Sequence, residues 1–398
     1  MSDIPTPGLI PEWAPQCATM LVWPNQDTDW GNSANDTSPS LLADISNTYV
    51  DLTHTICKYQ PTLIICKNTT HENHIRHQLN TSKPNSTPPK YPAIFVIAPY
   101  NDTWCRDFGP LSVWNNTKEA PEVGEGIGLE IELLDFRFNG WGNKYASNLD
   151  DQLCRQLSQQ KLFNKAITST DFALEGGSID GNGGGLLLTT KACLLSETRN
   201  KGFNQSDIEM QLRVHLGCKK ILWLSEGKLI GDDTDSHVDN LARFVNPTTV
   251  VYASCTMSND AHYSSLQAME KELHQLNDNN RLGLNLIPVP IPEPIIDKDT
   301  GSRLPGSYIN FILVNNAVIV PTFGVPEDAL ALKTYASIFP TRDIHSVIGN
   351  HLIRQFGGPH CASMQLPLGI IDIDMLSVAN TNAINTNVVN TTSIKEST

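Results

Sequence analysis

A run of acids around a single histidine is the stretch whose residue types could most directly carry out chemistry. Residues 231–240 read Gly-Asp-Asp-Thr-Asp-Ser-His-Val-Asp-Asn, and an apolar segment typical of a buried strand lies on each side of them. If this run is extended, Asp235, His237 and Asp239 point to one face, because side chains alternate along a strand. Nearby carboxylates favour the protonated imidazole, which can give a proton to a leaving group. The alternative interpretation is a solvated acidic turn.

A cysteine near the end of the sequence is the candidate nucleophile. Cys361 follows two glycines, a proline and a histidine. A cysteine attacks well only as its thiolate, which nearby positive charge favours, and a bound cationic substrate can supply that charge. The alternative is a buried, unreactive thiol. We interpret five other cysteines in that second way: Cys17, Cys57, Cys66, Cys193 and Cys255.

A metal site is a competing use of four of these side chains, namely His237, Asp239, His360 and Cys361. No Cys-x-x-Cys or His-x-x-x-His spacing accompanies them, so zinc has little support. We therefore expect no metal and no organic cofactor.

An arginine and an aspartate lie beside a tryptophan in a second candidate site loop. Trp104, Arg106 and Asp107 belong to a Trp-Cys-Arg-Asp-Phe-Gly-Pro sequence that follows a predicted strand. Asp107 can face a ligand while Arg106 makes structural hydrogen bonds. The alternative is a surface turn with one salt bridge.

A third acid and an amide complete the set of candidates. Glu175 ends a predicted strand directly before Gly176 and Gly177, and glycine permits close approach of the backbone to other groups. Asn310 lies inside a predicted strand at 307–314.

Short buried strands that alternate with helices predict an α/β fold around these residues. Further strands are expected near 18–23, 62–67, 91–97, 133–138 and 250–254, and helices near 40–58, 71–79, 148–162, 261–277 and 327–338. Residues 117–128 are expected to form a loose hairpin, and 181–185 a tight hairpin turn. Ser206 with Glu209 fits a capping box of a helix that ends near Gly217. The prolines of 284–294 indicate an edge segment.

Composition narrows the class of protein. The 398 residues carry a net charge of −14, which argues against nucleic acid or an anionic lipid surface as the main partner. We expect no membrane span and no signal peptide, because no long apolar run and no basic-then-apolar N-terminus occur. Nine unpatterned cysteines predict free thiols in a reducing, cytoplasmic setting. We expect one domain at 1–372 and a disordered Asn/Thr-rich tail at 373–398.

Taken together, these stretches resemble the agmatine deiminase and Porphyromonas-type peptidylarginine deiminase family of guanidine-modifying enzymes. The resemblance covers roughly residues 9–368 and rests on six motifs in the order of the family: residues 104–110, 138–142, 174–178, 234–240, 307–311 and 360–361. It implies the pentein fold, an α/β propeller of five ββαβ-like units around a pseudo-fivefold axis. The repeat itself is not visible in the sequence.

The resemblance also implies a role for each candidate residue. Cys361 would attack the guanidinium carbon, Asp107 and Asp239 would hold the guanidinium nitrogens, and His237 would protonate the departing ammonia. The implied roles of three others are less specific. Glu175 would be a further acid near the guanidinium or the histidine, Trp104 would pack against the substrate, and Asn310 would line the pocket.

The sequence departs from the family pattern beside three of these residues. Ser236 stands where the family more often has glycine, Phe108 stands where it more often has threonine, and the residues around Cys361 differ from the usual pattern. We expect hydrolysis of agmatine, a small cationic guanidine, to N-carbamoylputrescine and ammonia. Deimination of peptidyl-arginine or another guanidine is the first alternative, and a non-catalytic guanidine or polyamine binder is the second. Assembly as a homodimer is left open.

Overall fold

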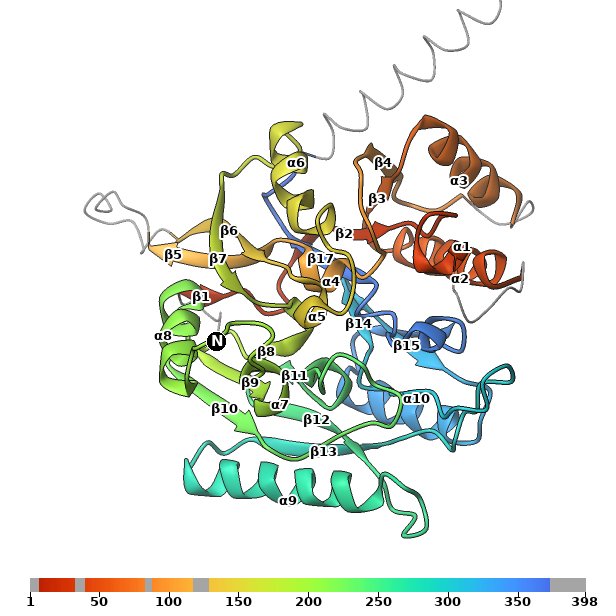
Figure 1. Ribbon diagram of the computed structural model, residues 1–398. Helices are drawn as coiled ribbons and strands as arrows, with labels where there is room; N and C mark the ends of the chain where they lie inside the picture. Colours follow the sequence, from red (N-terminus) through yellow and green to blue (C-terminus); the bar gives the residue numbers. More distant parts are fainter. Residues whose placement is uncertain (1–6, 33–39, 83–87, 117–128, 373–398) are drawn as a thin grey trace, which may run out of the picture.

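The strands form five small sheets arranged as a ring, with helices outside them (Figure 1). The computed structural model describes residues 7–32, 40–82, 88–116 and 129–372. Helices α3 (Thr69–Thr81), α6 (Leu153–Gln159), α8 (Gln205–Leu216) and α9 (Tyr263–Asn279) lie at the periphery of the molecule (Figure 1). The predicted α/β class is confirmed.

Four of the sheets repeat one pattern, in which an antiparallel pair is followed by a helix and by a third strand parallel to the second. The strands of these sheets are β5 (Leu111–Asn116), β6 (Leu129–Arg137) and β7 (Ile167–Ala173); β8 (Ile179–Gly181), β9 (Leu186–Thr190) and β10 (Lys220–Leu224); β11 (Ala242–Asn246), β12 (Thr249–Ser254) and β13 (Asn285–Pro290); and β14 (Ile312–Val314), β15 (Ala317–Thr322) and β16 (Asp343–Ile348). Helices α6, α8, α9 and α10 (Glu327–Ile338) provide the respective crossovers.

The fifth unit is made from both ends of the chain. Strand β17 (Ser363–Pro367) pairs antiparallel with β2 (Gln16–Val22), which is followed by α2 (Ser40–Ile56) and the parallel strand β3 (Thr62–Cys66). Helix α3 and strand β4 (Ala93–Ile97) extend this sheet. Five ββαβ units therefore close into the implied pentein ring. Because one unit is split between the two ends, the repeat is difficult to recognise along the sequence.

Shorter elements lie between these strands and helices, and the first of them, β1, pairs antiparallel with β5. They are β1 (Gly8–Leu9), α1 (Asp29–Asn32), α4 (Cys105–Phe108), α5 (Gly140–Asn143), η1 (Asp150–Gln152), η2 (Gly176–Ser178), α7 (Lys191–Leu194), η3 (Val238–Asn240) and η4 (Leu352–Gln355).

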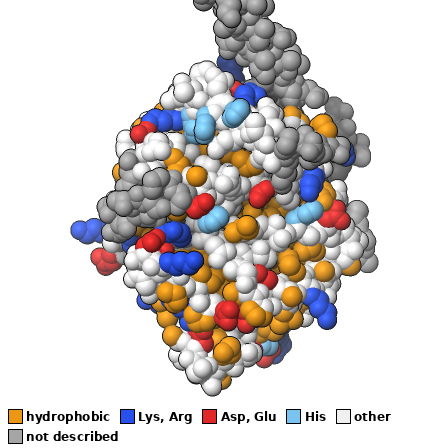
Figure 2. Space-filling model, turned by 90° about the vertical axis from the view of Figure 1, so that its right-hand side faces the viewer, with side chains coloured by type: hydrophobic (Ala, Val, Ile, Leu, Met, Phe, Trp, Pro, Cys, Tyr) orange, Lys and Arg blue, Asp and Glu red, His pale blue; other side chains and the backbone are white. Residues whose placement is uncertain are grey.

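Amphipathic patterning places the outer helices. Helix α9 buries Leu266, Met269 and Leu273, whose spacing puts them on one helix face, and that helix contacts β12. Each such side chain contributes roughly 1.5–3 kcal/mol when fully buried. No helix in the described part of the chain combines the length and apolar character needed to cross a membrane. Acidic, basic and hydrophobic side chains are interspersed on the face shown in Figure 2.

The ring brings together the short segments that precede the first strand of each unit. Asp107 lies in α4 before β5, and Gly177 lies in η2 before β8. Asp239 lies in η3 before β11, Asn310 precedes β14, and Cys361 precedes β17. Helix α4 contacts η2, and η2 contacts η3. One repeated position of the fold therefore supplies candidate site residues from all five units.

Several local predictions need correction. The capping box of α8 is made by Asn204 and Asp207, each two residues before the predicted pair, Ser206 and Glu209. Of the strand predicted at 307–314, only Ile312–Val314 forms a strand, β14. Residues 307–310 lie before it and contribute to the candidate site. The end at Gly217 is confirmed, with φ of 62°. Strand β13 is an edge strand, as its prolines indicate.

Two predictions concern residues outside the described part of the chain. The hairpin at 117–128 lies entirely there, and so does the proposed tail at 373–398. The division into one domain at 1–372 and a tail stays a prediction.

Candidate active site

Cys361 is held by the amide side chain of Asn310. Asn310 Nδ2 donates to Cys361 Sγ at 3.1 Å, while Asn310 Oδ1 accepts from the backbone N–H groups of His360 at 2.9 Å and Cys361 at 3.2 Å. Burial, followed by Asp239 and Asp107, raises the pKa of the Cys361 thiol well above its ordinary value. The sulfur is therefore protonated at neutral pH until a cation arrives beside it.

A cavity of about 630 Å³ connects this sulfur with the molecular surface. Its lining includes the buried Cys361 and Trp104 as well as Asp29, Asp299 and Ser302, which are exposed. A ligand can therefore reach the thiol along this cavity. Trp104, which we expected to contact the substrate, is part of its wall.

Asp107 is fixed by two donors. Gly177 N donates to its Oδ1 at 2.9 Å, and Trp141 Nε1 donates to its Oδ2 at 2.9 Å. Trp141 has a φ of 52°, a region that side chains other than glycine seldom occupy. Burial, with help from Asp239 and against the effect of His237, raises the pKa of Asp107 to about 6.

Asp239 has one oxygen in use and one oxygen without a partner. Its Oδ2 lies 2.8 Å from His360 Nδ1 and 3.3 Å from Cys361 Sγ. Its Oδ1 is buried and has no hydrogen-bond partner among the described residues. Burial alone would raise the pKa of Asp239, but His360 and His237 lower it. A buried, ionised oxygen without a donor is costly, so it marks a position for a ligand N–H group.

Gly177 lies at the point where the catalytic candidates meet. A Cβ on this residue would lie 2.8 Å from His237 Nδ1, 2.9 Å from Asp107 Oδ1 and 3.0 Å from Asp239 Oδ2. These distances are below van der Waals contact, so only glycine fits here without displacing a neighbour. The close approach that the Gly176–Gly177 pair permits is therefore used at Gly177.

His237 is placed between two carboxylates. Its Nε2 lies 3.1 Å from Glu175 Oε2 and its Nδ1 lies 3.7 Å from Asp107 Oδ1. Burial alone would lower the pKa of His237, but Asp107, with further contributions from Cys193 and Glu175, raises it well above its ordinary value. The ring is therefore protonated at neutral pH and can act as a proton donor.

The prediction that Asp235, His237 and Asp239 share one face of an extended segment is wrong. Asp235 and Ser236 have φ values of 64° and 66°, and η3 follows directly. His237 and Asp239 are buried, whereas the side chain of Asp235 is 36% exposed and lies 3.0 Å from Lys144. The backbone turns because this segment must direct two side chains inward from a short loop.

Arg199 is a site residue that the sequence analysis missed. Its Nε donates to Glu175 Oε1 at 3.1 Å and Oε2 at 2.9 Å, and its Nη2 donates to Thr234 O at 3.0 Å. It also pairs with Asp235. Arg199 therefore fastens the 231–236 loop to Glu175, the partner of His237. It lies in a Glu-Thr-Arg-Asn sequence without a local pattern that would have distinguished it.

One group of described residues has metal-ligand atoms within 4.8 Å of one another, namely Glu175, Cys193 and His237. It shares only His237 with the four ligands considered from the sequence. Glu175 is already paired with the guanidinium of Arg199 at 2.9 Å. The sequence interpretation of Cys193 as a buried cysteine agrees with its burial.

Comparison with known proteins decides the family. The model of the Porphyromonas-type peptidyl-arginine deiminase family matches residues 8–367. The chain belongs to this family. Curated relatives include the agmatine deiminase of Stutzerimonas stutzeri, which is 32% identical over 377 residues, covering 89% of this chain and 94% of the relative. The agmatine deiminase of Pseudomonas putida is 33% identical over 378 residues with the same coverage.

Solved structures of deiminases have the same fold. A C. jejuni agmatine deiminase with a cysteine-to-serine substitution and bound substrate superposes with a TM-score of 0.78 at 32% identity, covering 93% of this chain and 98% of that chain. A putative arginine deiminase from Porphyromonas gingivalis gives a TM-score of 0.77 at 34% identity, covering 92% and 100%. The pentein fold and the family predicted from the sequence are both confirmed.

Proposed function

We propose that this chain is an agmatine deiminase that converts agmatine to N-carbamoylputrescine and ammonia. The observation that carries the proposal is a pair of buried carboxylates near the sulfur of Cys361. Asp107 lines the cavity together with Cys361, and Asp239 lies behind the sulfur, with its Oδ2 3.3 Å from Cys361 Sγ and its Oδ1 unpaired among the described residues. A planar guanidinium with N–H donors on both sides matches paired carboxylates. The similarity to agmatine deiminases over most of the chain supports the same assignment.

In the proposed reaction, binding of the guanidinium places its carbon next to Cys361 and favours the thiolate. The sulfur attacks the carbon, and the C–N bond to the departing amine breaks as His237 transfers its proton to that nitrogen. The product of this step is a covalent thiouronium. His237, now neutral, takes a proton from water, and the resulting hydroxide attacks the carbon. The carbonyl then forms as the C–S bond breaks: the sulfur leaves with the electron pair as the thiolate, and the hydroxyl proton is released to solvent.

Glu175 and Asn310 support this chemistry without contacting the reacting carbon. Glu175 accepts a hydrogen bond from His237 Nε2 and so stabilises the imidazolium. Burial alone would raise the pKa of Glu175, but the neighbouring His237 and Arg199 lower it. Asn310 stabilises the thiolate through its N–H donor. Trp104 lines the cavity and offers an aromatic wall for the aliphatic part of the substrate.

The charges along the cavity favour agmatine over a substrate with a carboxylate. The lining contains two arginines and six aspartates: Asp29, Asp102, Asp107, Asp233, Asp297 and Asp299. Arg303 is held by both oxygens of Asp260 at 2.9 Å, and Arg354 pairs with Asp297 at 3.3 Å and with Asp299. Both lining arginines are therefore neutralised already. A second cationic group, such as the primary amine of agmatine, is attracted here, whereas a carboxylate is repelled.

The test compares ammonia release from agmatine, free arginine and a peptide with C-terminal arginine at equal concentrations. We expect kcat/KM to be highest for agmatine. Preference for the peptide would replace the proposal by peptidyl-arginine deimination, and release from none of the three would reject the deiminase assignment. Cys361→Ala should remove turnover and leave the circular dichroism spectrum unchanged. Retained turnover in this variant would refute covalent catalysis.

The cytoplasmic location and a homodimer stay proposals of the sequence analysis. The free cysteines support a reducing compartment, since all nine are buried and unpaired by disulfides. Sedimentation velocity of the purified protein measures the number of subunits, and fractionation of cells measures the location.

A further inference from the structure

A row of hydrogen-bonding groups leads from Cys361 through Asp239 and His360 to Glu12. Cys361 Sγ lies 3.3 Å from Asp239 Oδ2, and the same oxygen lies 2.8 Å from His360 Nδ1. The other ring nitrogen, His360 Nε2, lies 2.7 Å from Glu12 Oε1. His360 is buried, and its position in the sequence directly before Cys361 gives no indication of this row.

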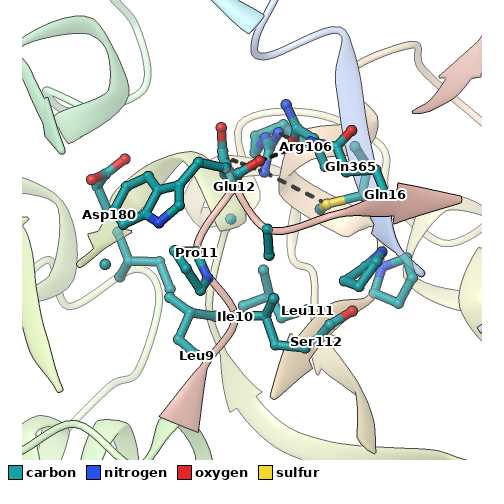
Figure 3. Close-up of a pocket in the computed structure, with 18 of the residues that line it drawn as sticks. Leu9, Ile10, Pro11, Glu12, Gln16, Arg106, Leu111, Ser112, Asp180 and Gln365 are labelled. Atoms are coloured by element: carbon teal, nitrogen blue, oxygen red, sulfur yellow. Dashed lines mark hydrogen bonds and ion pairs between the residues drawn. The ribbon is translucent and has the colours of Figure 1, made fainter. Parts of the chain in front are cut away.

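Glu12 belongs to the segment between β1 and β2, far from Cys361 in sequence, and two arginines hold it. Arg106 Nη1 lies 3.0 Å from Glu12 Oε1, and Arg243 Nη2 lies 2.5 Å from Glu12 Oε2. Figure 3 shows Glu12, Arg106 and Gln365 together at one end of a small cavity of about 60 Å³. Asp180, which pairs with Arg243 at 3.3 Å, lines the same cavity. Glu12 is therefore a fixed carboxylate that faces the outer nitrogen of His360.

The proposed reaction needs an acceptor for the proton of the Cys361 thiol. His237 cannot take it before the first step, because that ring already carries the proton that the departing amine requires. Among the acids and histidines of the described residues, Asp239 is the one within hydrogen-bond distance of the sulfur, at 3.3 Å. Asp239 must in turn be ionised to hold the guanidinium, so the proton has to move further.

We propose that His360 receives the thiol proton of Cys361 through Asp239, and that Glu12 stabilises the resulting imidazolium. The S–H bond breaks as the proton moves to Asp239 Oδ2, and Asp239 passes it to the lone pair of His360 Nδ1. The products are a thiolate, an ionised Asp239 and an imidazolium that donates from both nitrogens to carboxylates. The step needs no further reactant, and it rests on the proposed cysteine chemistry.

The groups around His360 suit a change of charge during the reaction. Burial, then Arg106 and Arg243, lower the pKa of His360, whereas Glu12 and Asp239 act in the opposite direction. The ring is thus neutral and able to accept a proton at neutral pH before substrate binds. A guanidinium that binds Asp107 and Asp239 favours the thiolate and so drives the proton toward His360. His360 acts through Asp239 and is a positioning residue that also stores a proton.

The test follows alkylation of Cys361 by 2-chloroacetamidine, a small cation with a planar amidinium, between pH 6 and pH 9. His360→Asn keeps a polar side chain beside Asp239 but cannot accept a proton. We expect alkylation of this variant to be slower by about 100-fold at pH 7, and the deficit to shrink about tenfold for each pH unit, because hydroxide then removes the thiol proton. His74→Asn, a change of the same type at an exposed histidine of α3, should behave as the wild type.

Glu12→Gln provides a second measurement, since its amide oxygen can still accept from His360 while the negative charge is lost. We expect slower alkylation at pH 7 by about tenfold with the same recovery at high pH. A deficit of His360→Asn that is constant across the pH range, or a wild-type rate, would overturn the proposal. If His360→Asn does not fold, a wild-type pH dependence of Glu12→Gln overturns it instead.

The alkylation assay separates this proposal from the proposed function. It reports loss of the thiol proton and needs no turnover, and mass spectrometry identifies the modified cysteine. A wild-type protein that releases no ammonia from any guanidine but shows the expected pH dependence in both variants would reject deimination and retain the proton path.

Discussion

Replacing Gly177 with alanine adds a single methyl group at the centre of the candidate site. That methyl would lie 2.8 Å from His237 Nδ1, 2.9 Å from Asp107 Oδ1 and 3.0 Å from Asp239 Oδ2. Gly177 does not have a positive φ, so alanine meets no backbone strain here. The N–H of residue 177 that donates to Asp107 is also retained. The effect of the substitution therefore comes from the displacement of three side chains.

The size of the effect follows from these distances. Heavy atoms at optimal contact lie roughly 3.5–4.0 Å apart, so the three groups must move by about 0.5–1 Å. Misplacement of about 1 Å can cost about 100-fold in rate, and we expect a loss of this order in kcat/KM for agmatine. The same overpacking should lower the free energy of unfolding by roughly 1–3 kcal/mol. The protein should remain folded, since stabilities of roughly 5–15 kcal/mol are usual.

The assay measures ammonia release over a range of agmatine concentrations, together with urea unfolding. Gly184→Ala is the matched control, because Gly184 is exposed in the β8–β9 turn and an added Cβ there has ordinary contacts with Asn182 at 3.4 Å and beyond. We expect this control to keep wild-type kcat/KM. Activity of Gly177→Ala within about threefold of the wild type would show that His237, Asp107 and Asp239 do not converge as described.

Three further outcomes are expected. Because burial and neighbouring carboxylates raise the pKa of Asp107 to about 6 in the free enzyme, kcat/KM should fall as pH decreases, with a midpoint near 6; a flat profile from pH 5 to 7 would contradict this. Ser236→Gly should raise the free energy of unfolding by roughly 0.5–1 kcal/mol in urea titrations, since φ at this position is 66°, and a lower midpoint would count against backbone strain. Glu175→Gln removes a charge that favours protonated His237, so the alkaline limb of the pH profile of kcat should move to lower pH; an unmoved limb would exclude this role.

The family and the fold class were available from the sequence, because the residues that carry the resemblance occur in order and in characteristic combinations. Helices such as α10 were predicted with their observed bounds, since an amphipathic pattern depends only on local spacing. The prediction for Asp235 was wrong because it, too, used only local spacing. Alternation along a strand is a local rule, and the left-handed φ values at Asp235 and Ser236 depend on what the loop must contact.

The sequence by itself determined which side chains could perform the chemistry, since a thiol, an imidazole and several carboxylates have fixed reactivities wherever they lie. The tertiary structure alone decided their partners. Glu12 and Arg199 have no local signal, because each acts through residues that are distant along the chain: Glu12 reaches His360 only after the ring closes between β2 and β17, and Arg199 reaches Glu175 and the 231–236 loop only after adjacent units pack. The pKa values that make the site reactive follow from burial and from those partners, which are properties of the folded chain.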